Sequence, residues 1–225
     1  MAAMLALLAA GLWGCAAFLG GQSSRRAALL PVLSVDLLVG TLVAFPLAFL
    51  IADRFEFRDL LVGAASGFFG LLGVTFFYRG LRGPMAAVAP VTGVLMATVP
   101  FLWGVGFGEH LSLWQTVGVV LGLISIALIS SPGRTVHPIT LAPLMHGLIS
   151  GVGFGIAAII LNTTNPSTAP WPIFGARLFP AIAVFAMAVK RHQPPTGIGN
   201  ARRFAVGAGL ANALAAIAYL AALNR

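Results

Sequence analysis

Charge is scarce in this sequence. Only 8% of its 225 residues are Asp, Glu, Lys or Arg, whereas 59% are hydrophobic. In a typical soluble domain about a quarter of the residues are charged. A water-soluble fold could not bury so large an apolar fraction. The composition therefore excludes a soluble globular protein and predicts an all-α membrane protein that crosses the cell membrane several times.

Cysteine is nearly absent, and histidine is sparse and scattered. The one cysteine, Cys15, lies within an apolar run, which excludes an intrachain disulfide and a cysteine-based metal cluster. The four histidines have none of the spacings that zinc ligands require; they are His110, His137, His146 and His192. We therefore predict no metal site.

Lysine is also rare, since Lys190 is the one lysine, and catalytic motifs are missing. No Gly-x-x-x-x-Gly-Lys-Ser/Thr loop is present to bind nucleotide phosphates, which argues against transport driven by ATP on this chain. No Ser/His/Asp set or pair of catalytic carboxylates is evident. We predict that the protein is not an enzyme and needs no cofactor.

Acidic residues are few, with five against 13 basic residues and a net charge of +8. The basic residues stand in short loops between apolar runs, which is their usual place beside membrane helices. This arrangement favours the lipid bilayer, and not nucleic acid, as the partner. The positive-inside rule applied to alternate loops favours an amino terminus outside.

Long apolar runs, in contrast, are abundant. A helix needs about 20 residues to cross the hydrocarbon core, and eight runs approach or exceed this length. The first run lacks a convincing cleavage site, so we interpret it as a retained helix. The expected helices cover residues 2–21, 31–52, 60–78, 84–106, 113–131, 142–161, 169–189 and 203–223.

The fourth and fifth runs form a hairpin that is rich in proline. Pro84 opens the fourth run, where its missing N–H costs nothing. Pro90 and Pro100 lie inside that run, and each should kink the helix and free a carbonyl group. Such groups are tolerated in a bilayer where protein or water satisfies them, so the hairpin predicts a lined path. Ser112 and Gln115 match a capping box at the start of the fifth run.

Small residues recur at a spacing of four, which lets helix backbones approach closely. These glycines are Gly63/Gly67, Gly118/Gly122 and Gly147/Gly151/Gly155. We interpret all three groups as helix-packing positions.

An internal repeat emerges when the chain is shifted by 141 residues without a gap. Its most informative matches are Gly14 on Gly155, Pro31 on Pro172 and Tyr78 on Tyr219. The shift carries the first helix onto the sixth, so the repeat has five helices and its second copy enters the membrane from the opposite side. The predicted domains are a first repeat at 1–131 and a partial second repeat at 142–225.

Three stretches carry a family resemblance: "LLAAGLWGCAAFLGG", "FFYRGLRGPMAAVAPV" and, most specifically, "GEHLSLWQTVGVVLGLISIALIS". They resemble the EamA family of the drug/metabolite transporter superfamily. The resemblance implies ten helices, a central cavity between inverted repeats, and movement of small metabolites, often outward. Counterparts of the last two helices are missing, as expected of a truncated or shortened relative. The family usually has its amino terminus inside, so the orientation stays open.

Two charged residues fall inside apolar runs. Asp36 could bind a cationic substrate or carry a coupling proton, because an ionisable residue at membrane depth is costly and often functional. It could also lie near the membrane edge, close to Arg25 and Arg26. Arg177 occupies the position of Asp36 in the other repeat, which leaves two alternatives: a charge pair across the repeat axis, or a side chain that reaches the headgroups.

The remaining candidates for substrate binding are aromatic, polar or proline residues within the runs: Trp13, Tyr78, Pro90, Trp103, Phe154, Asn212 and Tyr219. The aromatic rings could stack on a flat or cationic substrate. An aromatic belt at the membrane interface is the alternative. Asn212 could line a pore or bind a neighbouring helix, and we interpret Glu109 in the hairpin turn as structural.

The favoured function is a secondary transporter, with export of small organic metabolites or drugs by alternating access. The alternative is a truncated membrane fragment or helper subunit that does not transport. The expected partners are the bilayer and a small-molecule substrate, and the pairing of two copies as a homodimer is left open.

Overall fold

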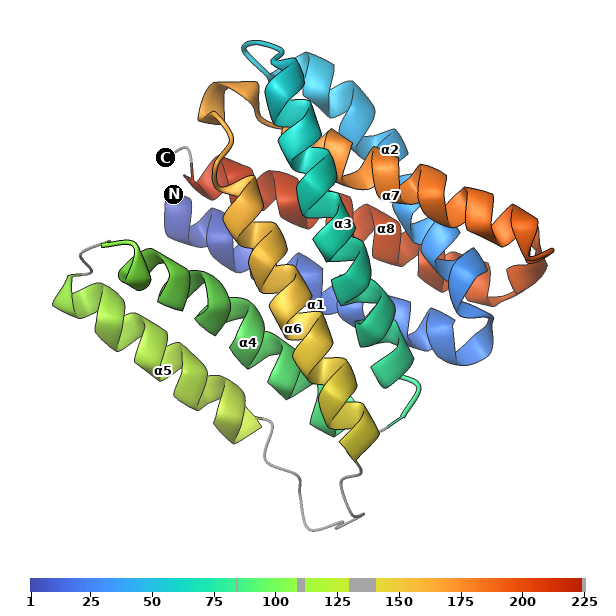
Figure 1. Cartoon of the computed structure of the whole chain (residues 1–225), viewed down its shortest axis with the longest axis horizontal. Helices are drawn as coiled ribbons and strands as arrows, with labels where there is room; N and C mark the ends of the chain where they lie inside the picture. Colours follow the sequence, from blue (N-terminus) through green and yellow to red (C-terminus); the bar gives the residue numbers. More distant parts are fainter. Residues whose placement is uncertain (84, 109–111, 130–140, 224–225) are drawn as a thin grey trace. The chain divides into compact units, whose positions relative to one another are not determined.

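The computed structural model describes residues 1–83, 85–108, 112–129 and 141–223, and in these ranges it is all-helical. The described ranges contain eight α-helices, together with the short 3-10 helices η1 (Pro166–Thr168) and η2 (Pro195–Ile198) (Figure 1). The α-helices are α1 (Ala2–Arg26), α2 (Leu29–Ile51), α3 (Phe57–Gly80), α4 (Met85–Gly106), α5 (Leu113–Ile129), α6 (Leu141–Leu161), α7 (Trp171–Lys190) and α8 (Ala201–Leu223). The predicted all-α fold with about eight helices is confirmed.

Seven of these helices are long and apolar enough to cross a membrane, and α5 is a shorter apolar helix. The chain is therefore an integral membrane protein. Two compact units can be distinguished, one made of residues 1–68 and 160–225 and the other of residues 69–159. The boundary between them falls inside α3 and inside α6.

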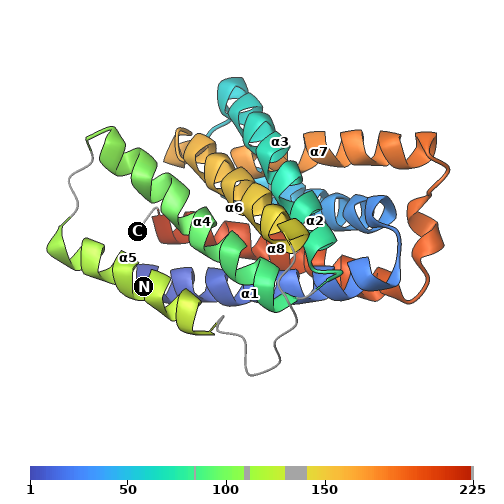
Figure 2. The ribbon, with the colours of Figure 1, turned by 60° about the horizontal axis from the view of Figure 1, so that its bottom comes forward.

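In the first unit, α1 lies beside α8, and α2 packs against both α7 and α8 (Figure 1; Figure 2). The helices α2 and α7 are antiparallel: Phe45 contacts Phe174 at 5.3 Å between ring centroids, and Phe49 contacts Trp171 at 4.8 Å. Residue numbers thus rise along α2 while they fall along α7. Because these two helices correspond under the 141-residue shift, their opposite directions agree with an inverted repeat.

Glycines bring α3 close to α7 within the first unit. A Cβ at Gly63 would collide with the backbone carbonyl of Pro172, and one at Gly67 with that of Ala176. Only a residue without a side chain fits at such backbone-to-backbone contacts. The predicted packing role of this pair is confirmed.

In the second unit, the glycines of α6 form a stripe against α4. Each would place an added Cβ within 3.0 Å of a side chain on α4: Gly147 at Val91, Gly151 at Leu95 and Gly155 at Val99. Residue numbers rise together in the two helices, which are therefore parallel. Close contact between small residues is the usual way in which helices associate in a bilayer, where the hydrophobic effect between them is absent.

Of two predictions about the hairpin of α4 and α5, one is confirmed and one is wrong. The capping box is confirmed, since the Ser112 N–H donates to Gln115 Oε1 at 2.8 Å and the Gln115 N–H donates to Ser112 Oγ at 3.3 Å. The packing prediction for Gly118 and Gly122 was wrong, because an added Cβ at either glycine meets nothing within 4 Å. Both lie on an exposed face of α5.

The predicted hairpin also includes three prolines and a glutamate in its turn. The helix α4 continues from Met85 to Gly106 through both Pro90 and Pro100. Pro84 and Glu109 lie outside the described residues.

Candidate functional site

Asp36 is a buried carboxylate within α2, with only 2% of its surface exposed. It is the eighth residue of a helix that starts at Leu29, so it lies about 10 Å along the axis from that start. The side chain of Asn212, on α8, donates from Nδ2 to Asp36 Oδ1 at 3.3 Å. The structure thus brings together two of the residues that the sequence singled out.

Gly209 explains how α8 comes near enough for this hydrogen bond. It lies one turn before Asn212, and an added Cβ there would be 2.5 Å from the backbone oxygen of Asp36 and 2.9 Å from the Cβ of Val39. The backbones of α2 and α8 therefore meet at this level. A side chain at residue 209 would separate the two helices and lengthen the contact between the amide and the carboxylate.

The hydroxyl groups near Asp36 on α2 serve their own helix. Ser34 Oγ donates to the carbonyl of Leu30, and Thr41 Oγ1 donates to the carbonyl of Leu37, both at 2.8 Å. Such local bonds satisfy a hydroxyl group within the helix that carries it. The carboxylate of Asp36 is therefore the polar group of this stretch that is shared with another helix.

Arg177 of α7 lies against Gly40, one helical turn beyond Asp36 on α2. Its Cδ, Nε and Nη1 atoms are 3.4, 3.7 and 3.7 Å from the position that a Cβ on Gly40 would occupy. Glycine at position 40 thus leaves room for the arginine side chain. The two charged residues, which correspond under the 141-residue shift, are in this way placed on adjacent antiparallel helices.

An aromatic pair belongs to the same unit. The rings of Trp13 on α1 and Tyr219 on α8 have centroids 5.5 Å apart and are inclined by 49°. Tyr219 follows Asn212 by seven residues, which is about two helical turns, and so it lies on nearly the same face of α8. One face of α8 therefore carries both the amide that binds Asp36 and the aromatic pair.

The other four candidates belong to the second unit. Tyr78 is 1% exposed and Trp103 is 51% exposed, with its ring 4.2 Å from that of Phe107. The Phe154 ring packs over Gly73, where an added Cβ would be 2.7 Å from its Cδ1 atom. Pro90 is partly buried in α4. The substrate-binding role of all nine candidates stays a prediction.

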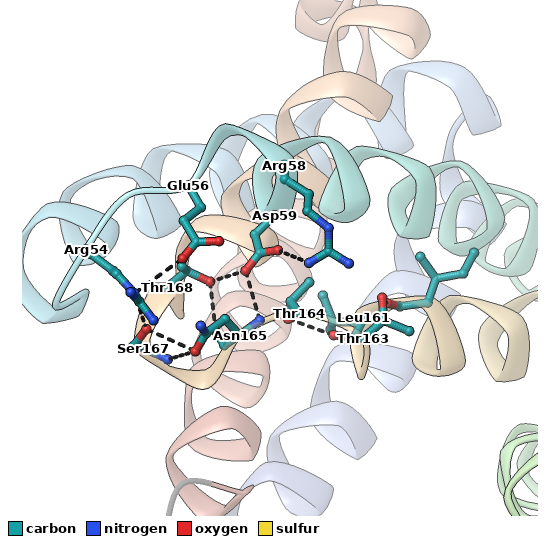
Figure 3. A network of polar contacts seen from close by, with 11 residues as sticks. Arg54, Glu56, Arg58, Asp59, Leu161, Thr163, Thr164, Asn165, Ser167 and Thr168 are labelled. Carbon is teal, nitrogen blue, oxygen red and sulfur yellow. Dashed lines mark hydrogen bonds and ion pairs between the residues drawn. The ribbon is translucent and has the colours of Figure 1, made fainter.

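A second polar cluster, which the sequence did not reveal, joins the start of α3 and the loop before it to the loop before α7 (Figure 3). The carboxylate of Asp59 is fully buried. Its Oδ2 atom accepts the Asn165 N–H at 2.8 Å and the Thr168 hydroxyl at 2.6 Å. The guanidinium of Arg58 donates to the other oxygen, Oδ1, at 3.1 Å.

Arg54 extends this cluster. Its Nε atom donates to Ser167 Oγ at 2.7 Å and lies 3.3 Å from Glu56 Oε1. The Ser167 hydroxyl in turn donates to Asn165 Oδ1 at 3.0 Å. Since both oxygens of the buried carboxylate are engaged by protein donors, we interpret the cluster as a structural clasp between two loops. In the sequence, this cluster had one indication, which is that Asp59 is an acidic residue in the first turn of α3.

No group of three or more His, Cys, Asp or Glu side chains that could hold a metal ion occurs in the part of the chain that the structure describes. The groups described on and near this part of α2 and α8 are the Asp36 carboxylate, the Asn212 amide, the Arg177 guanidinium and, about two turns further along α8, the Trp13 and Tyr219 rings. Such groups can bind a cation or a proton and can stack on a flat molecule.

Comparison with known proteins gives one match. The family model described as the EamA-like transporter family matches residues 1–131. Searches of curated proteins and of solved structures gave no significant match.

Proposed function

The chain belongs to the EamA-like transporter family, and from this premise we propose that it is a secondary transporter that exports small organic molecules across the cell membrane. Its family and its apolar helices make the protein a membrane transporter of the drug/metabolite type. Direction, substrate class and mechanism are the proposal.

The observation that carries the proposal is a buried carboxylate in a membrane helix that packs antiparallel to its repeat counterpart. Transporters built from inverted repeats bind their substrate near the midplane and expose the site alternately by moving one repeat against the other. Asp36 lies on α2, which packs antiparallel to α7. Alternating access is therefore the mechanism that this arrangement supports best.

Asp36 is proposed to bind a cationic group of the substrate or a coupling proton. A charged side chain within a membrane is costly, and such residues commonly mark pathways for substrates, ions or protons. The amide of Asn212 holds the carboxylate in place by its hydrogen bond. The Trp13 and Tyr219 rings, about two turns from Asn212 along α8, would stack on an aromatic or cationic part of the substrate.

Transport assays in liposomes test this proposal. The protein is reconstituted with a pH-sensitive dye inside the vesicles, and organic cations such as tetraphenylphosphonium are applied as probes with and without a pH gradient. The variant Asp36→Asn keeps the shape of the side chain but removes its charge, so gradient-driven transport should be lost. The matched control is Asp53→Asn, an exposed acidic residue after α2.

Unchanged gradient-driven transport in Asp36→Asn would contradict the role of this carboxylate. Thermal unfolding of both variants in detergent shows whether a loss of transport comes from a loss of fold. If neither the native protein nor the control variant moves any probe of a broad panel, the proposal of a secondary transporter for organic molecules is itself contradicted.

A further inference from the structure

The end of α1 and the start of α8 are fixed to each other at one end of the first unit (Figure 1, right). The hydroxyl of Ser23 donates to the backbone oxygen of Ala201 at 3.0 Å, and Ser23 is fully buried. Arg26 lies three residues after Ser23 on α1, and Arg203 lies two residues after Ala201 on α8. The two arginines are therefore held near each other by a contact that involves neither of their charges.

Both of these arginines lie over the same aromatic ring. The guanidinium carbon of Arg26 is 4.3 Å from the centroid of the Phe204 ring, and that of Arg203 is 4.8 Å from it. Since each is within about 5 Å of one centroid, a distance typical of cation–π contacts, the two cations are within about 10 Å of each other. Both side chains are nevertheless exposed to the surroundings.

The charged residues around this pair of arginines are all basic. The basic residues at this end of the first unit are Arg25, Arg26, Lys190, Arg191, Arg202 and Arg203. No Asp or Glu occurs in residues 20–30 or 186–206, which form this end. The acidic residues Asp53, Glu56 and Asp59 stand at the other end of α2, where the Asp59 clasp engages them in part.

Held in this way, the two guanidinium groups would bind an anion with little loss of side-chain freedom. Arginine binds phosphate oxygens through two parallel N–H donors, and a contact with a ring face restricts the long side chain beforehand. The pair lies at the ends of two membrane-spanning helices, which is the level of lipid headgroups. Basic groups at this level attract anionic lipids.

We propose that Arg26 and Arg203, positioned by Phe204, form a binding site for an anionic phosphate group of the kind that a phospholipid headgroup carries. The site is separate from the Asp36 carboxylate and does not depend on what the protein transports. Its ligand chemistry is a phosphate mono- or diester, and the source of that phosphate is the question that the experiment settles.

The test measures lipid binding to the full chain in detergent. Phosphatidylglycerol and phosphatidylcholine are titrated separately, and bound lipid is counted by native mass spectrometry. The double variant Arg26→Gln/Arg203→Gln should lower the affinity for phosphatidylglycerol by at least about 100-fold, as expected when two hydrogen bonds to a charged group are lost. The matched control is Arg191→Gln/Arg202→Gln, which removes the same charge from exposed positions at the same end of the first unit, and it should lower this affinity by no more than about 25-fold, the effect of the general attraction to an anionic surface alone.

A third variant separates positioning from charge. Phe204→Leu keeps all the arginines but removes the ring that holds them, and it should lower the affinity for phosphatidylglycerol about fivefold. Its binding of phosphatidylcholine should match that of the native protein. A structural role of Phe204 alone would lower thermal stability without this selective loss.

The outcomes are distinct. Selective loss of phosphatidylglycerol binding in the double variant supports the site and assigns it to lipid. Displacement of the lipid by millimolar inorganic phosphate, with the same loss in the double variant, supports the phosphate chemistry and assigns it to a soluble ligand. Equal losses in the two double variants, or no loss in either, overturn the proposal.

Discussion

Arg177 of α7 lies against Gly40 of α2, with its Cδ atom 3.4 Å from the position that a Cβ on Gly40 would occupy. An arginine is thus accommodated between two membrane helices because its neighbour has no side chain. Gly40 is also one turn from the buried carboxylate of Asp36. The absence of a side chain at Gly40 therefore allows the charged side chain of Arg177 to lie at this place.

Enlarging Gly40 should displace Arg177. In Gly40→Leu the new side chain would occupy the space of the guanidinium group, and overpacking of this kind costs about 1–3 kcal/mol of stability. Thermal unfolding in detergent measures the loss. Gly11→Leu on α1 is the matched control, since an added Cβ there meets nothing within 4 Å. Equal melting temperatures for the two variants would contradict the placement of Arg177.

Substitution of Gly209 should act on the carboxylate through the distance between helices. In Gly209→Ala the new methyl group would meet the backbone oxygen of Asp36, so α8 would move away and the hydrogen bond of Asn212 would lengthen. Gradient-driven transport should fall, and a similar fall is expected of Asn212→Ala, which removes the amide that donates to Asp36. The control is Gly14→Ala, at a position on α1 with open space. Full transport by Gly209→Ala would show that this helix contact is not required.

The glycine stripe of α6 should tolerate no side chain at its centre. Gly151→Ala would place a Cβ 2.5 Å from that of Leu95 and 2.9 Å from the backbone oxygen of Thr92, and the expected destabilisation is about 1–3 kcal/mol. Gly118→Ala on α5 is the control, because its face is open and alanine favours a helix over glycine by up to about 1 kcal/mol. The pair should therefore change stability in opposite directions, as read from resistance to unfolding by denaturing detergent.

Removal of the Asp59 charge should loosen the clasp in Figure 3. In Asp59→Asn one oxygen is replaced by an NH₂ group, which faces donors and cannot accept from them. Hydrogen bonds to a charged group contribute about 1.5–3 kcal/mol each, so a loss of that order is expected in thermal unfolding. Hydrogen exchange should also become faster in the loop that carries Asn165 and Thr168.

The control for the clasp is Asp53→Asn. Asp53 contacts the same loop through its backbone N–H, which donates to the Ser167 carbonyl at 3.2 Å, and its side chain is exposed. Substitution there should leave both stability and exchange unchanged. If the two aspartates behave alike, the carboxylate of Asp59 does not hold the loops together.

Local features were predictable from the sequence. The eight apolar runs become eight helices because about 20 apolar residues suffice to cross hydrocarbon and a helix satisfies its own backbone groups. The capping box at Ser112 was predictable because its partner, Gln115, lies within one turn. Gly118 and Gly122 were misread because spacing alone says nothing about whether another helix is present on that face.

Asp36 stood out in the sequence because charge inside an apolar run is rare, whatever surrounds it. Asn212 also stood out, as a polar residue inside an apolar run, but its pairing with Asp36 was not predictable because 176 residues separate the two. The clasp of Asp59 was missed entirely, because Asn165 and Thr168 lie 106 and 109 residues away and are ordinary loop residues by themselves.

The sequence by itself determined the membrane location, the positions of the helices and the family, and it predicts a second repeat that is inverted. These follow from composition and from spacing along the chain, which need no knowledge of neighbours. The tertiary structure alone decided that α2 meets α7 and α8, that Gly40 leaves room for Arg177, and that Arg26 and Arg203 share one ring. Such pairings depend on which helix backbones can approach each other. In a membrane, this approach is determined by the fit of small residues between helices. Apolar character does not determine it, because all the helices are apolar.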